Sequence, residues 1–208
     1  MVQHLLLALV VAPLVAYGAP WTPIWRCASL PARRRLAAAY MSSPRWKLPR
    51  RLGRTLMAPV VAWLMFNVDL CVWHVPAIYG LTLRDGAVHE LEHLSFLVLG
   101  VIFWIQVLDS PPLRARLDYA GRVVYTLLAA TVAWGLAVVL AFASSPLYSA
   151  YAEQASRPGG ISALGDQQLA AGIMWGPGSV PYALVVFVGL YRWLGSPRGQ
   201  ALTRERSV

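Results

Sequence analysis

Charge and cysteine are both scarce in this sequence. Of its 208 residues, 13% are charged and 58% are hydrophobic, and the mean hydropathy is +0.54. This composition is typical of an integral membrane protein and is rare among soluble domains. The two cysteines are Cys27, in a basic segment, and Cys71, in an apolar one. We therefore expect no disulfide framework.

The formal net charge of +9 could suggest a nucleic-acid partner. The positive residues, however, stand in short runs between apolar stretches, where they determine membrane topology. Nucleic-acid binding is therefore disfavoured. No basic region precedes the first apolar segment, because His4 leads directly into leucines. We interpret that segment as a retained span rather than a cleaved signal peptide.

Five apolar segments are candidates for membrane spans, each of which needs roughly 20 mainly apolar residues to cross a hydrocarbon core of about 30 Å. We expect helices, because an open sheet cannot satisfy its backbone polar groups in lipid. The segments cover residues 2–17, 55–79, 89–108, 119–143 and 168–194, the last with an expected kink at Gly176-Pro177-Gly178. The sequence therefore predicts an all-α, polytopic transmembrane helical bundle of about five spans. It shows no internal repeat, so we expect a single domain over residues 1–208.

Positive residues concentrate on one predicted side of the membrane. Cytoplasmic loops are rich in arginine and lysine, so the connection between the first two spans should be cytoplasmic. A contact between this basic connection and anionic lipid is an alternative explanation of its charge. The cytoplasmic residues would be Arg26, Arg33, Arg34, Arg35, Arg45, Lys47, Arg50, Arg51 and Arg54, then Arg114, Arg116 and Arg122, then Arg192, Arg198, Arg204 and Arg206. The opposite loops hold Arg84 and Arg157 and should face outward.

With this topology all four histidines gather at the outer surface. His4 opens the first span, His74 lies near the outer end of the second, and His89 and His93 open the third. Polar groups near hydrocarbon are costly unless they are paired or bound, so they are functional candidates. Further polar or soft side chains on the same side are Asp166, Gln167 and Gln168, with Met174 deeper, and Asn67 and Cys71 below His74.

His89 and His93 have the i, i+4 spacing that places two imidazoles on one helical face. Two more imidazoles could complete a metal site, and Cys71 or Met174 as a soft donor would favour Cu(I) over harder cations. The alternative is that each histidine only forms a hydrogen bond with a neighbouring helix or with the lipid interface. Clustering of four histidines on one side favours the metal site.

Residues 89–93 also match the H-E-x-x-H pattern, in which two histidines bind zinc and the glutamate activates water. An intramembrane zinc protease would use Glu90 as the base, with His74 or Asp166 as a third ligand. The pattern is short and lies at a membrane boundary. We therefore rank the protease below metal handling.

Several motifs together resemble a known family. They are Val2-Gln3-His4-Leu5-Leu6-Leu7 with Ala12-Pro13 and Gly18-Ala19-Pro20, Trp73-His74-Val75-Pro76 with Tyr79, His89 with Leu91-Glu92-His93, Leu147-Tyr148 with Tyr151, and Asp166-Gln167-Gln168-Leu169 with Met174-Trp175. In this order, over nearly the whole chain, they are similar to the CtaG-type cytochrome c oxidase assembly factors. Glu90 is not part of the family pattern, which weakens the protease hypothesis. Members usually carry further spans before the Gln-His motif, so the resemblance implies a truncated or misassigned start.

The resemblance implies a multi-pass protein of the bacterial plasma membrane that is needed to mature a haem-copper oxidase. It also implies copper handling, with oxidase subunits or copper chaperones as partners. Our leading hypothesis is a non-enzymatic assembly factor that binds copper, as Cu(I) in preference to zinc, through His4, His74, His89 and His93. Asp166 and the nearby glutamines would be auxiliary groups. A scaffold for oxidase subunits that binds no metal is the structural alternative.

Overall fold

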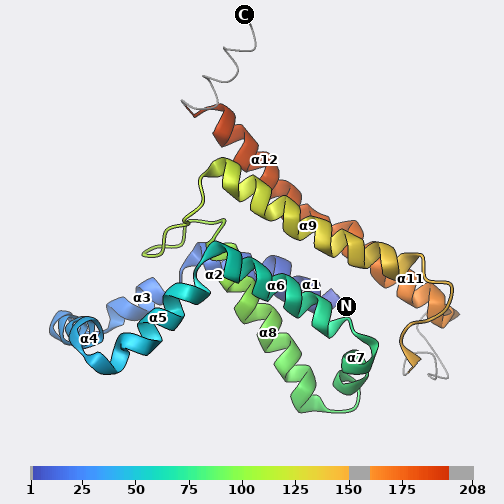
Figure 1. Ribbon diagram of the computed structural model, residues 1–208, viewed down its shortest axis with the longest axis horizontal. Helices are drawn as coiled ribbons and strands as arrows, with labels where there is room; N and C mark the ends of the chain where they lie inside the picture. Colours follow the sequence, from blue (N-terminus) through green and yellow to red (C-terminus); the bar gives the residue numbers. More distant parts are fainter. Residues whose placement is uncertain (1, 150–159, 197–208) are drawn as a thin grey trace, which may run out of the picture.

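The chain folds into α-helices that pack into a bundle with a laterally projecting segment (Figure 1). The computed structural model describes residues 2–149 and 160–196, and these ranges contain no β-strand. The prediction of an all-α fold is therefore confirmed. Tyr151 and Arg157, and the tail residues Arg198, Arg204 and Arg206, lie outside the described residues.

Short connections join the helices up to Ile105, and a longer one follows that residue. In chain order they are α1 (Val2–Leu6), the π-helix η1 (Leu7–Val11), α2 (Ala12–Gly18), α3 (Trp21–Cys27), α4 (Leu30–Ser42), η2 (Pro44–Trp46), α5 (Lys47–Leu56), α6 (Pro59–Trp73), α7 (Pro76–Thr82), α8 (Gly86–Ile105), α9 (Tyr119–Ala141), α11 (Ala163–Trp175), η4 (Pro177–Ser179) and α12 (Val180–Leu194).

Three helical segments are long and apolar enough to cross a membrane. They are Gly86–Ile105, Tyr119–Ala141 and Ala163–Leu194. Two bent helix pairs, Val2–Gly18 with Trp21–Cys27 and Pro44–Leu56 with Pro59–Trp73, raise the number to five when each pair counts as one span. The prediction of a polytopic helical membrane protein is therefore confirmed.

The span boundaries differ from those predicted because caps and prolines act locally. Residues 55–79 are not continuous: α6 begins at Pro59 and ends at Trp73, and Pro76 starts α7. Proline is favoured in the first helical turn, where its missing N–H would have no partner. The third span begins three residues early because Asp85 accepts a hydrogen bond from the Ala87 amide (2.8 Å) and caps α8.

The fifth span also begins earlier than expected and contains a break. Ser162 caps α11 by accepting a hydrogen bond from the Gly165 amide (3.0 Å), which moves the start from residue 168 to Ala163. The 3-10 turn η4, Pro177–Ser179, interrupts the segment at the predicted kink.

Aromatic rings and small residues form the core that positions α1 and α2 against α8. The Phe103 ring stacks on Phe66 (4.4 Å between centroids) and on Tyr125 (4.8 Å). Ala12 is fully buried, and a Cβ atom built on Gly100 would lie 2.9 Å from the Ala12 Cβ. Glycine at position 100 therefore permits close approach of α2 and α8, as small residues do between membrane helices.

The two ends of the bundle carry different elements. The N-terminus, α7 and the start of α11 lie at one end, and the segment from α3 to α5 projects from the other (Figure 1). The first of these ends holds the histidines.

Candidate metal centre

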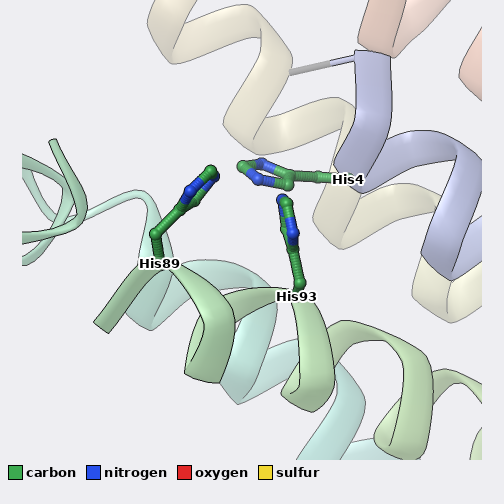
Figure 2. Close-up of side chains that lie close together, drawn as sticks. All are labelled: His4, His89 and His93. Carbon is green, nitrogen blue, oxygen red and sulfur yellow. The ribbon is translucent and has the colours of Figure 1, made fainter. Parts of the chain in front are cut away.

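Two helices bring three histidines together. His4 lies on α1, at the start of the chain, and His89 and His93 lie in the first two turns of α8. Because α1 continues through η1 into α2, which packs closely on α8, the core contact at Gly100 also holds His4 beside the α8 pair. Figure 2 shows the three imidazoles converging.

The geometry of this group, which we call the histidine triad, suits a single small ion. One ring nitrogen of each of His4, His89 and His93 lies within 4.8 Å of those of the other two. The ring centroids are 4.3 Å apart for His89 and His93, 4.9 Å for His4 and His93, and 6.1 Å for His4 and His89. Metal–imidazole bonds are about 2.0–2.1 Å long, so three nitrogens at this separation can reach one ion after small side-chain rotations.

The His4 ring is held from two sides. It stacks on Phe96 of α8, with ring centroids 5.3 Å apart and an interplanar angle of 26°. One turn further along, in the π-helix, the Ala8 carbonyl accepts a hydrogen bond from the Trp104 indole (2.8 Å). π-Helical turns are rare and occur frequently at functional sites. The hydrogen bond from Trp104 to this π-helical turn fixes the segment that carries His4 onto α8.

Glu92 contacts the triad, and our sequence analysis did not single it out as a site residue. Its carboxylate Oε1 lies 3.4 Å from Nδ1 of His4, and the residue is 1% exposed. A carboxylate beside one imidazole nitrogen favours the tautomer that leaves the other nitrogen free to bind metal. The sequence signal was present, because a carboxylate inside an apolar helix is a functional candidate by default.

A second acidic residue lies behind Glu92. Oδ1 of Asp69, on α6, accepts a hydrogen bond from the Trp73 indole (2.9 Å), and the same indole contacts the Ser95 hydroxyl (2.8 Å). Ser95 in turn donates to the Glu92 carbonyl (2.9 Å). This network ties α6 to the turn of α8 that carries Glu92 and His93.

A cavity of about 220 Å³ opens beside the triad. Its polar lining includes His4, Glu92, His74, Asp166, Tyr79 and Tyr148. His74 and Asp166 therefore share a cavity with His4 but do not belong to the group of converging donor atoms, which in the described part of the chain consists of the triad. Of the predicted ligands, His4, His89 and His93 form the triad, whereas His74 and Asp166 line the adjoining cavity.

His74 is oriented by two backbone contacts. Its Nδ1 lies 2.7 Å from the Leu70 carbonyl, and only a protonated Nδ1 can donate there, which leaves Nε2 as the free nitrogen. The Tyr148 hydroxyl donates to the His74 carbonyl (3.2 Å). Burial raises the pKa of Tyr148 to about 12, so this hydroxyl remains a donor at neutral pH.

The two glutamines predicted as auxiliary groups bind the backbone. Gln167 donates to the Leu140 carbonyl (2.9 Å) and accepts from the Leu147 amide (2.8 Å). Gln168 donates to the Ala141 carbonyl (3.1 Å). These carbonyls end α9 and lack helical partners, so the glutamines fasten the end of α9 to α11. Gln167 also lines the cavity beside His4, and the auxiliary role of the two glutamines stays a prediction.

The predicted soft donors also lie outside the triad. Met174 is buried against Ala133 and Ala137, where it belongs to the contact between α11 and α9, and it lines a cavity of about 30 Å³ together with His4. Cys71 is exposed on α6. Asn67 is buried and donates to the Trp63 carbonyl one turn earlier (2.8 Å). Cys71 does not belong to the converging donor set of the described residues.

The donor set therefore consists of nitrogen atoms. Three imidazoles suit copper and zinc, and the Cys71 thiol, which would favour Cu(I), is not among the converging donors of the described residues. Glu90, the base in the protease hypothesis, is exposed on α8 and forms no ion pair with a histidine in the described part of the chain.

Fold and site together define a polytopic membrane protein with a histidine triad at one end of its helical bundle. The family model for the cytochrome c oxidase caa3 assembly factor (Caa3_CtaG) matches residues 1–196. The chain belongs to this family, as the resemblance of its motifs implied.

The relatives extend well beyond this chain. An uncharacterized protein of Mycobacterium bovis and another of Mycobacterium tuberculosis are each 24% identical to it over 208 residues. An uncharacterized protein of Mycobacterium leprae is 21% identical over 215 residues. Each alignment covers 99% of this chain and 31% of the relative, so the chain spans about a third of the length of these relatives. No solved structure matches the chain.

Proposed function

We propose that this chain takes part in the assembly of a cytochrome c oxidase by holding a copper ion, as cargo, in the histidine triad. The observation that carries the proposal is the convergence of one donor nitrogen from each of His4, His89 and His93 within 4.8 Å. The function of the family is oxidase assembly. Copper is a metal of haem-copper oxidases, so a three-imidazole site in an assembly factor has a plausible cargo.

The buried carboxylate strengthens this proposal. Glu92 is 1% exposed, its Oε1 faces His4, and its Oε2 has no hydrogen-bond partner. A buried carboxylate is costly unless something compensates it. A cation in the triad would supply that compensation through His4, because a cation bound at one imidazole nitrogen makes the N–H at the other a stronger donor.

We further propose that the triad faces the outside of the bacterial plasma membrane. The opposite end of the bundle carries Arg114, Arg116 and Arg122, the basic connection before α6, and Arg192 at the end of α12. Arginine-rich loops remain cytoplasmic, which directs the histidines outward. Copper from that side would reach the triad past His74 and Asp166, which line the adjoining cavity.

Copper analysis of the purified full chain tests the proposal. After loading with Cu(I) under reducing conditions and desalting in detergent, the wild type should retain one copper ion per chain. The double variant His89→Ala/His93→Ala should retain none, because one imidazole cannot hold the ion alone. His74→Ala is the matched control, since it removes an imidazole of the same end that lies outside the triad. Equal copper in the wild type and the double variant would refute the copper site.

Orientation is tested separately by thiol labelling. A single cysteine introduced at Ala38 of α4, in a Cys27→Ser/Cys71→Ser background, should resist a membrane-impermeant reagent added to intact cells. A cysteine introduced at Gly80 of α7 should react. The reverse pattern would place the triad in the cytoplasm and contradict delivery to the outer side.

A further inference from the structure

The segment from α3 to α5, residues 21–56, forms an arm that leaves the helical bundle. It extends sideways from the end where α2 finishes and α6 begins (Figure 1). None of the helices α3, α4, η2 and α5 contains a buried residue. We call this segment the basic arm, because it carries nine arginine and lysine residues and no acidic residue.

Helix α5 of the basic arm has two chemically distinct faces. Leu48, Leu52 and Leu56 recur every four residues and therefore share one face. They are 65%, 52% and 37% exposed, so the described chain leaves at least half of Leu48 and Leu52 uncovered and part of Leu56. Arg50 and Arg54 lie on the opposite face. This is the pattern of a helix that lies in a membrane interface.

The bend between α5 and α6 gives the direction of α5. The segment Pro44–Leu56 meets Pro59–Trp73 at 73°. Membrane-spanning helices are tilted by about 20° on average from the bilayer normal, so α5 runs close to the plane of the membrane. Five cations between Arg45 and Arg54 exclude α5 from the hydrocarbon interior, because charged side chains are costly there. We therefore place α5 at the membrane surface.

The arm is folded rather than extended. Arg50 of α5 donates hydrogen bonds to the Tyr40 and Ser43 carbonyls, and its guanidinium lies 5.7 Å from the centre of the Tyr40 ring. That ring also contacts Trp46 (5.5 Å between centroids). These contacts hold the end of α4 to α5 across the η2 turn and do not involve the leucine face of α5.

We propose that the basic arm is a binding surface for anionic phospholipid, with the α5 leucines in the acyl-chain boundary and its cations at the lipid phosphates. The membrane is already present at this level, because α2 and α6 enter it on either side of the arm. Nine cations without a compensating carboxylate match an anionic leaflet, and each cation near such a surface adds favourable binding energy. A second copy of the chain would instead bring nine further cations against these, which would repel.

Fluorescence of labelled full-length chains in nanodiscs tests this proposal. Single cysteines replace Leu52 or Arg54 in the Cys27→Ser/Cys71→Ser background and carry the same environment-sensitive dye. Nanodiscs contain one chain each and a mixture of phosphatidylglycerol and phosphatidylcholine. The dye at position 52 should be quenched by spin labels on the acyl chains several times more strongly than the dye at position 54. Acrylamide, a neutral aqueous quencher, should give the opposite order.

Lipid charge and protein charge provide the controls. Phosphatidylcholine alone, or the additional substitution Arg51→Gln/Lys47→Gln, should weaken acyl-chain quenching at position 52. Equal quenching at positions 52 and 54 would overturn the interfacial position. Protection of position 52 that requires two chains in one nanodisc would assign the leucine face to a second copy instead. Quenching that is indifferent to both lipid charge and these substitutions would refute the anionic-lipid specificity.

Discussion

Glu92 and His4 are 88 residues apart in sequence, yet the Glu92 carboxylate Oε1 lies 3.4 Å from Nδ1 of the His4 imidazole. The pair joins α1 to α8 at the histidine triad. Because Glu92 is on the same helix as His89 and His93, one helix supplies two proposed ligands and the group that orients the third. The residues of the site can therefore be ranked by how much their substitution should lower copper affinity.

We predict that Glu92→Gln weakens Cu(I) binding without removing the site. The three imidazoles remain, but the amide lacks the negative charge that holds the His4 Nδ1–H and strengthens the ligand. Loss of such an outer partner typically lowers metal affinity by about 10- to 100-fold. Competition with a chromophoric Cu(I) chelator measures the change. An unchanged dissociation constant would show that Glu92 does not support His4.

Glu90→Gln is the matched control and also tests the protease hypothesis. Glu90 carries the same charge on the same helix but is exposed. We expect unchanged copper affinity and nearly normal oxidase maturation in cells whose only copy of the chain carries this variant. In a zinc protease Glu90 would be the general base, and its loss would abolish function with metal still bound. Abolished maturation with intact expression and metal content would favour hydrolytic chemistry.

Substitution of the cavity-lining residues His74 and Asp166 should lower copper affinity less than substitution of a triad residue. His74→Ala and Asp166→Asn alter side chains that line the cavity, whereas His93→Ala removes a converging donor. We predict that copper affinity falls by more than about 100-fold for His93→Ala, beyond the usual effect of an outer-shell change, and less for the other two. Chelator competition decides the order. A loss for Asp166→Asn as large as for His93→Ala would make Asp166 a direct ligand.

The sequence predicted the parts of the site that depend on local geometry. Helical spacing alone placed His89 and His93 on one face, and hydropathy alone gave the all-α bundle. The predicted topology ranks His74 ahead of His4 as the next ligand, because it places His74 at a depth similar to that of the pair. The close approach of α2 and α8 at Gly100 brings His4 to the pair, and the Leu70 carbonyl orients His74 separately. Such packing between distant segments leaves no periodic signal.

The glutamines Gln167 and Gln168 illustrate a second limit of sequence-based prediction. An amide side chain near a predicted site can form a hydrogen bond with a metal ligand or with a backbone carbonyl. The sequence alone does not distinguish the two cases. Gln167 and Gln168 lie opposite the final carbonyls of α9, which the sequence placed two residues later, at residue 143. Knowledge of where α9 ends would have been needed to assign them.

We predict that Gln167→Leu destabilises the fold and leaves the copper content of the folded protein unchanged. The substitution removes both hydrogen bonds that Gln167 makes, to the Leu140 carbonyl and from the Leu147 amide, and leaves a buried carbonyl without a partner. An unsatisfied buried group costs about 1–3 kcal/mol. Gln168→Leu, at an exposed position with one such bond, should cost less. Thermal unfolding in detergent measures both, and equal stabilities would contradict the role assigned to Gln167.

Gly100 offers the sharpest test that helix packing builds the triad. A Cβ atom at this position would lie 2.9 Å from the Ala12 Cβ and 3.4 Å from the Ala8 carbonyl oxygen, so Gly100→Ala must displace α2 from α8. Because α1 continues into α2, His4 should move with it. We expect overpacking to cost about 1–3 kcal/mol of stability and copper affinity to fall as well.

Two further variants make this prediction specific. Gly135→Ala, on α9, introduces a Cβ with no neighbour within 4 Å and should leave stability and copper affinity nearly unchanged. The compensating change Ala12→Gly, combined with Gly100→Ala, removes the clashing methyl group and should restore both. Thermal unfolding and chelator competition are measured on the same preparations. If Gly100→Ala retains full copper affinity despite lower stability, then α1 positions His4 independently of the contact between α2 and α8. If the double variant fails to recover affinity, the effect of Gly100→Ala arises elsewhere than at Ala12.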